Sequence, residues 1–279
     1  MMDESRDDAI AAQPGMLPSG RALFLSSHYD DVALSCGGTV ALLADRGPRP
    51  LIVTVFGGEV IDEVLNTFAR WKHSRWGLSD MDAVRLQRQS EDASAAAILG
   101  SDTRWLGFPD AIYRGERHAS DRDLYGAVQR TEIPLACMIA DEVQALPEWT
   151  GTSLVFVPLA AGSHVDHQLV FLAGQHLANR SVQVLAYEDC PYAIHTPEAL
   201  DARLAQVADC LGPPQDVSIA GTFDRRLDAI NTYATQVPVL FRFTCNVRGA
   251  VWDFCTRHGP QPGPVERFWP VLPTANTEV

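Results

Sequence analysis

The sequence lacks several patterns that would assign it to a common class of protein. It has six cysteines but no C-x-x-C pair, so neither a zinc knuckle nor a compact disulfide framework is indicated, and reduced, mostly buried thiols are expected. No apolar run approaches the length of a membrane span, and residues 1–20 contain no signal-peptide core, so we expect a cytoplasmic protein. The first strand-to-helix turn also lacks G-x-G-x-x-G, which disfavours a nicotinamide-dependent oxidoreductase.

Basic residues are scarce as well. Lys and Arg number 22 against 35 Asp and Glu, which gives a net charge of −13 and a sequence pI near 4.9. Nucleic acid and anionic membrane surfaces would repel such a chain, so neither is expected as a partner. The charge balance favours a neutral or cationic small substrate.

The hydrophobic pattern predicts an α/β protein. Apolar residues make up 46% of the 279 residues, enough for a substantial core. We expect a disordered tail over 1–20 and a single domain over 21–279, whose part after residue 210 alternates weakly and ends irregularly. Alternating strands and helices predict a Rossmann-like, mostly parallel sheet with helices on both faces. The expected strands are 22–27, 51–56, 153–158 and 182–187, and the expected helices are 37–44, 81–99, 132–146, 166–179 and 223–234.

Two clusters of metal-ligand residue types each follow a predicted strand. In open parallel sheets the ligand crevice lies beyond the carboxyl ends of the strands, so the two clusters converge if those strands are neighbours. Two imidazoles and one carboxylate would leave a coordination position open for water, as a catalytic metal site requires. The clusters are His28-Tyr29-Asp30-Asp31 and His164-Val165-Asp166-His167.

The spacing within the clusters suggests separate roles. His28 and Asp31 are three residues apart and share one side of a turn, whereas Asp30 points elsewhere and could act as a general base. Asp166 stands between two histidines and could orient an imidazole through its other ring nitrogen. A structural interpretation is also open, with an Asx turn capping the next helix in the first cluster and a helix N-terminal carboxylate in the second.

The stretch Leu23–Gly38, LFLSSHYDDVALSCGG, resembles the signature of the PIG-L/LmbE-like zinc-dependent N-deacetylases, in which His-Pro-Asp-Asp-Glu and a double glycine follow a strand. Further segments are similar to blocks of that family in the same order, so the resemblance spans about residues 22–270. These segments are Arg88-Gln-Ser-Glu91 with the alanine run to Leu99-Gly100, Leu106–Asp110, Ser163–His167, Ala229–Gln236 and Glu266–Trp269.

The resemblance implies a hydrolase that uses Zn²⁺, or another divalent metal such as Fe²⁺. Its substrate would be a small N-acylated amino sugar or glycoconjugate, from which it removes an N-acyl and most simply an N-acetyl group. The implied metal ligands are His28, Asp31 and His167. Asp30 would be the general base, and His164 would polarise the scissile carbonyl or protonate the leaving amine.

The resemblance also implies that Arg88 and Asp110 contact sugar hydroxyls. From the residues alone, Arg88 could instead pair with Glu91 on a solvated helix face, and Asp110 could be a turn residue after a proline. Two positions depart from the family pattern. Tyr29 replaces the usual proline and brings an aromatic ring beside the metal, and Val32 replaces the usual glutamate, which indicates a divergent substrate.

The segment 57–80 is longer than an ordinary connection and could form a lid. Trp71 and Trp76 within it could stack on a sugar ring, or dock a short helix on the domain surface. Two other functions stay open from the residues. Two histidines and a carboxylate also form the facial triad of non-haem Fe(II) oxygenases, although their usual scaffold is a β-barrel. The other open function is that of a carbohydrate-binding relative without catalytic turnover. The sequence is also compatible with a homo-oligomer.

Overall fold

The computed structural model describes most of the chain. Residues 1–19 of the expected tail lie outside the described residues, as do parts of the segment considered as a lid. The described ranges are 20–58, 65–78, 81–150, 153–258 and 263–274.

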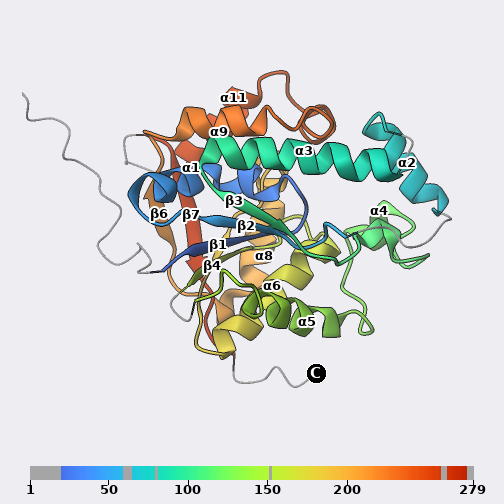
Figure 1. Cartoon of the computed structure of the whole chain (residues 1–279), viewed down its shortest axis with the longest axis horizontal. Coiled ribbons are helices and arrows are strands. Elements are labelled where there is room, and N and C mark those ends of the chain that lie inside the picture. The colour runs from blue at the N-terminus through green and yellow to red at the C-terminus, as the bar shows by residue number, and fades with distance from the viewer. Residues whose placement is uncertain (1–19, 59–64, 79–80, 151–152, 259–262, 275–279) are drawn as a thin grey trace, which may run out of the picture.

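Seven strands form one sheet in the order β3-β2-β1-β4-β5-β7-β6 (Figure 1). Strands β1 to β5 are parallel to one another, whereas β7 runs antiparallel to both β5 and β6. The expected α/β class with a mostly parallel sheet is therefore confirmed. The strands are β1 (Ala22–Ser26), β2 (Leu51–Thr54), β3 (Asp102–Trp105), β4 (Leu154–Pro158), β5 (Gln183–Tyr187), β6 (Gln215–Ser218) and β7 (Val265–Pro270).

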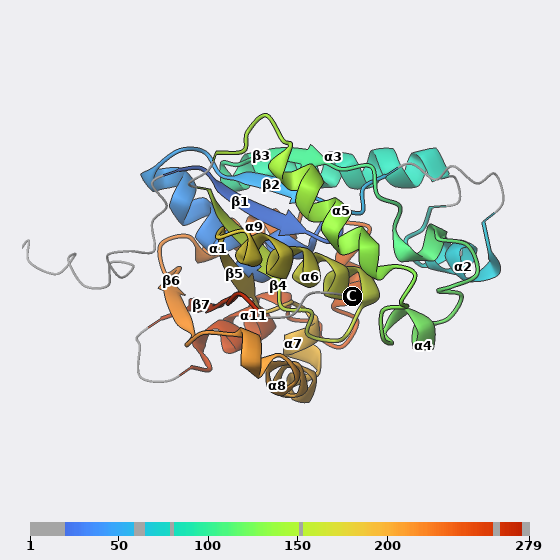
Figure 2. The same ribbon diagram turned by 90° about the horizontal axis from the view of Figure 1, so that it is seen from below.

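Helices cover both faces of the sheet (Figures 1 and 2). One face carries α1 (Asp31–Arg46), α3 (Met81–Leu99), α9 (Phe223–Ile230) and α11 (Val247–Thr256), and the other carries α5 (Ile133–Gln144) and α6 (Val165–Asn179). Successive strand residues point to opposite faces, so β1 supplies both cores. Phe24 stacks on Phe156 at 4.1 Å in the first core, and Leu25 lies in the second.

Shorter elements complete the fold. Among them, α2 and α4 lie at the right-hand end of the molecule in both views (Figures 1 and 2). No helix in the described part of the chain is long and apolar enough to cross a membrane. The shorter elements are α2 (Thr67–Arg75), η1 (Ala111–Tyr113), α4 (Asp121–Leu124), α7 (Tyr192–His195), α8 (Pro197–Gln206), η2 (Ala208–Cys210) and α10 (Val237–Leu240).

The helix expected to open at the double glycine is confirmed as the second part of α1, although helical turns also precede it. Helix α1 begins at Asp31 and kinks at Cys36, whose φ of −142° and ψ of 26° are not helical. Beyond the kink, the N–H groups of Gly38 and Thr39 donate to the carboxylate of Glu266, at 2.9 and 2.7 Å. A Cβ atom on Gly38 would lie 2.9 Å from that carboxylate, so the glycine leaves room for the cap at the start of this second part.

The expectation of an irregular end after residue 210 is wrong, because β6 and β7 pair there and extend the sheet. Both strands carry charged residues, which conceal the strand pattern in the sequence. Glu266 lies 3.1 Å from Arg226, and Arg267 forms two hydrogen bonds with Asp216. The expected helix over 81–99 is confirmed as α3, and β1 and β4 pair, which meets the condition for the two ligand clusters to converge.

Candidate active site

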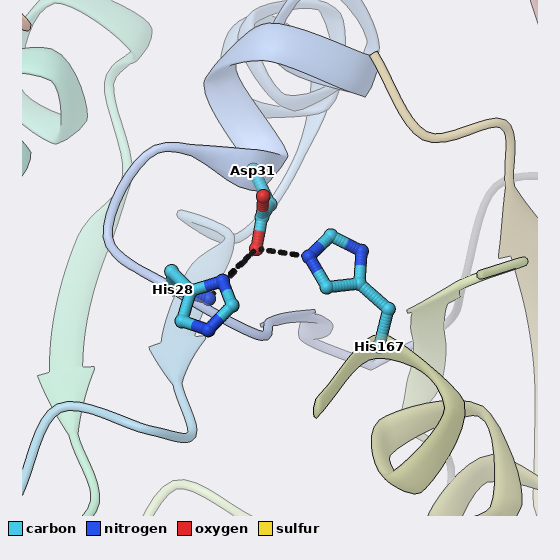
Figure 3. Close-up of side chains that lie close together, drawn as sticks. All are labelled: His28, Asp31 and His167. Atoms are coloured by element: carbon cyan, nitrogen blue, oxygen red, sulfur yellow. Dashed lines mark hydrogen bonds and ion pairs between the residues drawn. The ribbon is translucent and has the colours of Figure 1, made fainter. Parts of the chain in front are cut away.

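The pairing of β1 with β4 brings the two ligand clusters to one edge of the sheet. His28 lies in the short loop after β1, Asp31 is the first residue of α1, and His167 lies in the first turn of α6. Figure 3 shows the carboxylate of Asp31 between the two imidazoles. Its Oδ2 atom is 3.5 Å from His28 Nδ1 and 3.4 Å from His167 Nε2. One potential ligand atom from each residue lies within 4.8 Å of the other two, and all three side chains are almost completely buried.

Each imidazole is held by a carboxylate at its far nitrogen. His28 Nε2 lies 3.0 Å from Asp166 Oδ2, and His167 Nδ1 lies 2.6 Å from Asp189 Oδ1. A carboxylate accepts hydrogen bonds, so the far nitrogens carry the hydrogens and the near nitrogens present lone pairs to Asp31. His167 Nε2 is buried and has no hydrogen-bond partner among the described residues.

This donor set fits a divalent cation. Two lone pairs and a carboxylate oxygen that face each other in a buried space repel unless a positive charge lies between them. The pKa of His28 shows the same attraction for positive charge, because a second proton on the ring can take the place of a cation. Burial opposes protonation of His28, yet the nearby carboxylates of Asp110 and Asp166 raise its pKa well above the usual value. Two imidazoles and one carboxylate suit zinc or iron(II).

A second grouping of three potential ligands shares His28 with the first. It consists of His28, His164 and Asp166. The Asp166 carboxylate is already satisfied, because it accepts hydrogen bonds from Ala111 N at 3.0 Å and from Arg114 Nη1 at 2.7 Å as well as from His28. A cation there would have to displace these bonds, so the first grouping is the better site.

Asp166 belongs to a chain of buried charges that leads away from His28. Its partner Arg114 donates from Nε to Glu132 Oε1 at 2.8 Å, and Glu132 in turn lies 2.9 Å from His118 Nε2. The side chains of these residues are at most 5% exposed. The structure therefore pairs Asp166 with the ring of His28, in the orienting position considered from the sequence.

Asp30 lies apart from the three grouped side chains. It stands at the N-cap position of α1 but makes no capping hydrogen bond, contrary to the Asx-cap interpretation. Its Oδ1 atom is 3.5 Å from Arg88 Nη2. Burial raises the pKa of Asp30, although the charge of Arg88 opposes this shift. Arg88 is itself buried, and Glu91 binds Thr235 at 2.7 Å, so Arg88 does not lie on a solvated face.

His164 caps helix α6. Its Nδ1 atom accepts a hydrogen bond from the backbone N–H of Asp166 at 3.2 Å, so its hydrogen is on Nε2. Burial lowers the pKa of His164 well below its usual value, and His28 lowers it further. Asp110 accepts from Ile112 N at 3.1 Å, which bears out its turn role, and its other oxygen lies 3.6 Å from His28 Nε2.

A cleft of about 660 Å³ opens above these residues. Trp71 and Trp76 both line it. Trp71 stacks on Phe68 with ring centres 5.7 Å apart and is 47% exposed, whereas Trp76 lies 5.0 Å from the guanidinium of Arg88. The Tyr29 ring, expected beside the metal, instead packs against Arg88, and its hydroxyl donates to a backbone carbonyl at 3.0 Å. The cleft floor includes His28, Asp30, Asp31, Arg88, Asp110 and His164.

Sequence reasoning missed Asp189, Arg114 and Glu132. Asp189 follows β5 by two residues, at the same sheet edge as the clusters, and that position is a usable signal. Arg114 and Glu132 lie outside strands and long helices and belong to no recognisable pattern.

The fold and the site together define a class. A histidine and aspartate cluster of this kind, at the carboxyl edge of a parallel sheet, fits a hydrolase and has the residues to hold a divalent metal ion. Comparison with known proteins then identifies the family, because the family model of PIG-L, GlcNAc-PI de-N-acetylase, matches residues 23–178. The chain belongs to this family and is an N-deacetylase, a hydrolase of amide bonds.

Individual relatives agree with this assignment. A 2'-N-acetylparomamine deacetylase from Streptomyces fradiae is 29% identical over 236 residues, covering 84% of this chain and 79% of the relative. The crystal structure of the A40926 pseudoaglycone deacetylase Dbv21 matches with a TM-score of 0.74 and 28% identity, over 92% of this chain and 98% of that one. The zinc-inhibited form of the teicoplanin deacetylase Orf2 matches with a TM-score of 0.76 and 25% identity, over 92% and 100%.

Proposed function

We propose that this chain is a divalent-metal-dependent deacetylase of an N-acetylated amino sugar or of a glycoside that carries one. Zinc is the first candidate metal, and His28, Asp31 and His167 are its proposed ligands. The single observation that carries the proposal is the arrangement of the two imidazoles, whose far nitrogens are held by Asp166 and Asp189 while their near nitrogens face one oxygen of Asp31. The relatives named as deacetylases of 2'-N-acetylparomamine and of the A40926 pseudoaglycone support the sugar-bearing substrate.

A divalent ion, when bound there, lowers the pKa of water and polarises a carbonyl oxygen. The residues of the chain supply the remaining chemistry. Asp30 accepts the proton of the water that attacks the acyl carbon, and it transfers this proton to the amide nitrogen as the C–N bond breaks. The products are the amine and the carboxylic acid, whose proton passes to the amine to give an ammonium group and a carboxylate. Arg88, 3.5 Å away, holds the Asp30 carboxylate in place.

His164 stabilises the developing oxyanion in this proposal. Because its Nδ1 atom accepts from the α6 backbone, the neutral ring can donate only from Nε2. A fixed hydrogen-bond donor in a buried site favours charge that develops in the transition state. This division of labour assigns the proton of the leaving amine to Asp30 rather than to His164. Arg88 and Asp110 remain the proposed contacts to sugar hydroxyls.

The experiment is a metal titration coupled to amine release. The purified protein is stripped with a chelator, and zinc or iron(II) is added back while primary amine is measured from a panel of N-acetylated sugars and glycosides. We expect activity to rise up to one equivalent of metal per chain. Because a zinc-inhibited form of one relative is known, excess zinc should be tested separately. Equal amine release with and without metal would contradict the proposal.

An oxygenase is the weaker alternative, because the observed scaffold is an α/β sheet rather than a β-barrel. It would consume oxygen in the presence of an oxo-acid, whereas the deacetylase would not. The cytoplasmic location, the single-domain organisation and assembly into a homo-oligomer stay predictions.

A further inference from the structure

The outer wall of the cleft carries positive charge. Lys72 and Arg75 reach it from α2, and Arg242 reaches it from the segment after α10. Lys72 is neutralised by Asp121 at 2.8 Å. Arg75 and Arg242 are both exposed, and within the described part of the chain neither has a carboxylate in ion-pair contact.

Arg75 and Arg242 give this part of the cleft a positive charge although the chain has a net charge of −13, and other exposed arginines, such as Arg70 and Arg122, also have no ion pair among the described residues. Acidic side chains are abundant enough to neutralise arginines on other parts of the surface. Examples are the pairs Arg225–Asp45, Arg248–Asp224, Arg180–Asp141 and Arg104–Glu148. The cleft mouth therefore differs in sign from the molecule as a whole, and it would attract an anionic group.

The same wall is also apolar. Among the described residues, eight large hydrophobic side chains are exposed, and three of them line this cleft: Trp71, Tyr125 and Phe243. Leu240 of α10 lines the cleft as well. Exposed aromatic faces gathered in a concave site are typical of a surface that binds a flat apolar group.

We propose that the cleft mouth binds an acidic, aromatic aglycone, an inference that rests on the proposed function. The substrate is then an N-acetyl amino sugar linked to a ring system that carries an anionic group. The sugar lies over the metal ligands, the ring lies against Trp71 and Phe243, and the anion faces Arg75 and Arg242. A polycationic aminoglycoside, which the net charge alone favours, would meet the wrong sign of charge at this mouth.

Three aryl glycosides of N-acetylglucosamine that differ only in charge test the proposal: the 4-carboxyphenyl, phenyl and 4-aminomethylphenyl compounds. We expect kcat/KM to fall in that order, by about two- to fivefold for each arginine that an anion faces. The preference should shrink as salt is added, because exposed charges are screened.

Variants identify the residues responsible. Arg75→Gln and Arg242→Gln should each reduce the preference, and the double variant should abolish it. Arg248→Gln, which changes an exposed arginine on α11, is the matched control and should keep the preference. Equal kcat/KM for the three glycosides, or a preference that survives in the double variant, would overturn the proposal.

A binding measurement separates this proposal from the proposed function. Calorimetry on the metal-free protein, which does not depend on turnover, should show tighter binding of the 4-carboxyphenyl glycoside than of the phenyl glycoside. If no N-acetylated compound releases amine but this difference in binding persists, the deacetylase function fails and the acidic subsite stands. If amine is released without any charge preference, the subsite fails and the function stands.

Discussion

Replacing Asp189 with Asn perturbs the metal site without touching a proposed ligand. Asp189 uses both oxygens, because Oδ1 accepts from His167 Nδ1 at 2.6 Å and Oδ2 accepts from the backbone N–H of Ala161 at 3.0 Å. An asparagine has one acceptor oxygen. If that oxygen takes the Ala161 N–H, the amide NH₂ faces His167 and forces the imidazole hydrogen onto Nε2.

That hydrogen would point at Asp31 Oδ2, which is 3.4 Å from Nε2, and would occupy the direction needed for a metal. To bind metal, the variant must leave one buried donor unsatisfied, at a cost of about 1–3 kcal/mol. This cost corresponds to roughly 10- to 100-fold weaker metal binding, the range typical of residues that orient a ligand. Saturating metal should restore part of the activity.

The assay is competition for zinc with a chromophoric chelator, accompanied by a melting curve to show that the fold is intact. Asp216→Asn is the control, because Asp216 also holds a nitrogen-bearing side chain, Arg267, but does so at the β6–β7 edge. Zinc affinity of Asp189→Asn within twofold of the wild type would refute the reasoning.

Three further predictions concern other residues. Asp31→Asn should lose the metal, whereas Asp30→Asn should retain it and lose about 10²-fold or more in turnover; equal metal loss by elemental analysis would contradict these roles. Trp71 is half exposed on the cleft, so Trp71→Leu should raise KM by a factor equivalent to about 1–2 kcal/mol and leave kcat and Tm normal. Trp76 is more buried, so Trp76→Leu should also lower Tm. Burial raises the pKa of Asp92 to about 7. Between about pH 4 and pH 7 the folded protein therefore holds a proton that the unfolded chain has released. The contribution of protonated Asp92 to stability is complete below this range and is lost as the pH rises through it. Asp92→Asn should flatten this fall, by at most about 3 kcal/mol, in urea unfolding between pH 5 and 8, and unchanged pH dependence would count against it.

The elements predicted correctly from the sequence are those whose burial can be inferred from the apolar residues within the element itself. Strands β1, β2, β4 and β5 are continuous apolar runs, because helices cover both of their faces. The convergence of the two ligand clusters was conditional on β1 and β4 being neighbours. Strand order depends on packing between distant segments, so local sequence could state the condition but not decide it.

The features missed depend on partners far away in the chain. β3 is a short, largely exposed edge strand, and β6 and β7 carry charges that are satisfied only across the fold. Arg114 gains its role from Asp166, 52 residues later. The sign of charge at the cleft mouth cannot be predicted for a related reason, since a net charge sums over the whole surface and conceals two arginines that have no ion pair among the described residues.

The cap on the kinked helix α1 has a consequence for the order of events during synthesis. The proposed ligands His28 and Asp31 are synthesised well before β7, and they directly follow β1, which lies inside the sheet. The carboxylate that caps Gly38 and Thr39, however, belongs to Glu266 in β7, the last strand to be made. Until that strand docks, two backbone donors within α1 lack their buried acceptor. The nascent chain should therefore complete its metal pocket, and become able to retain metal, only after β7 has been synthesised.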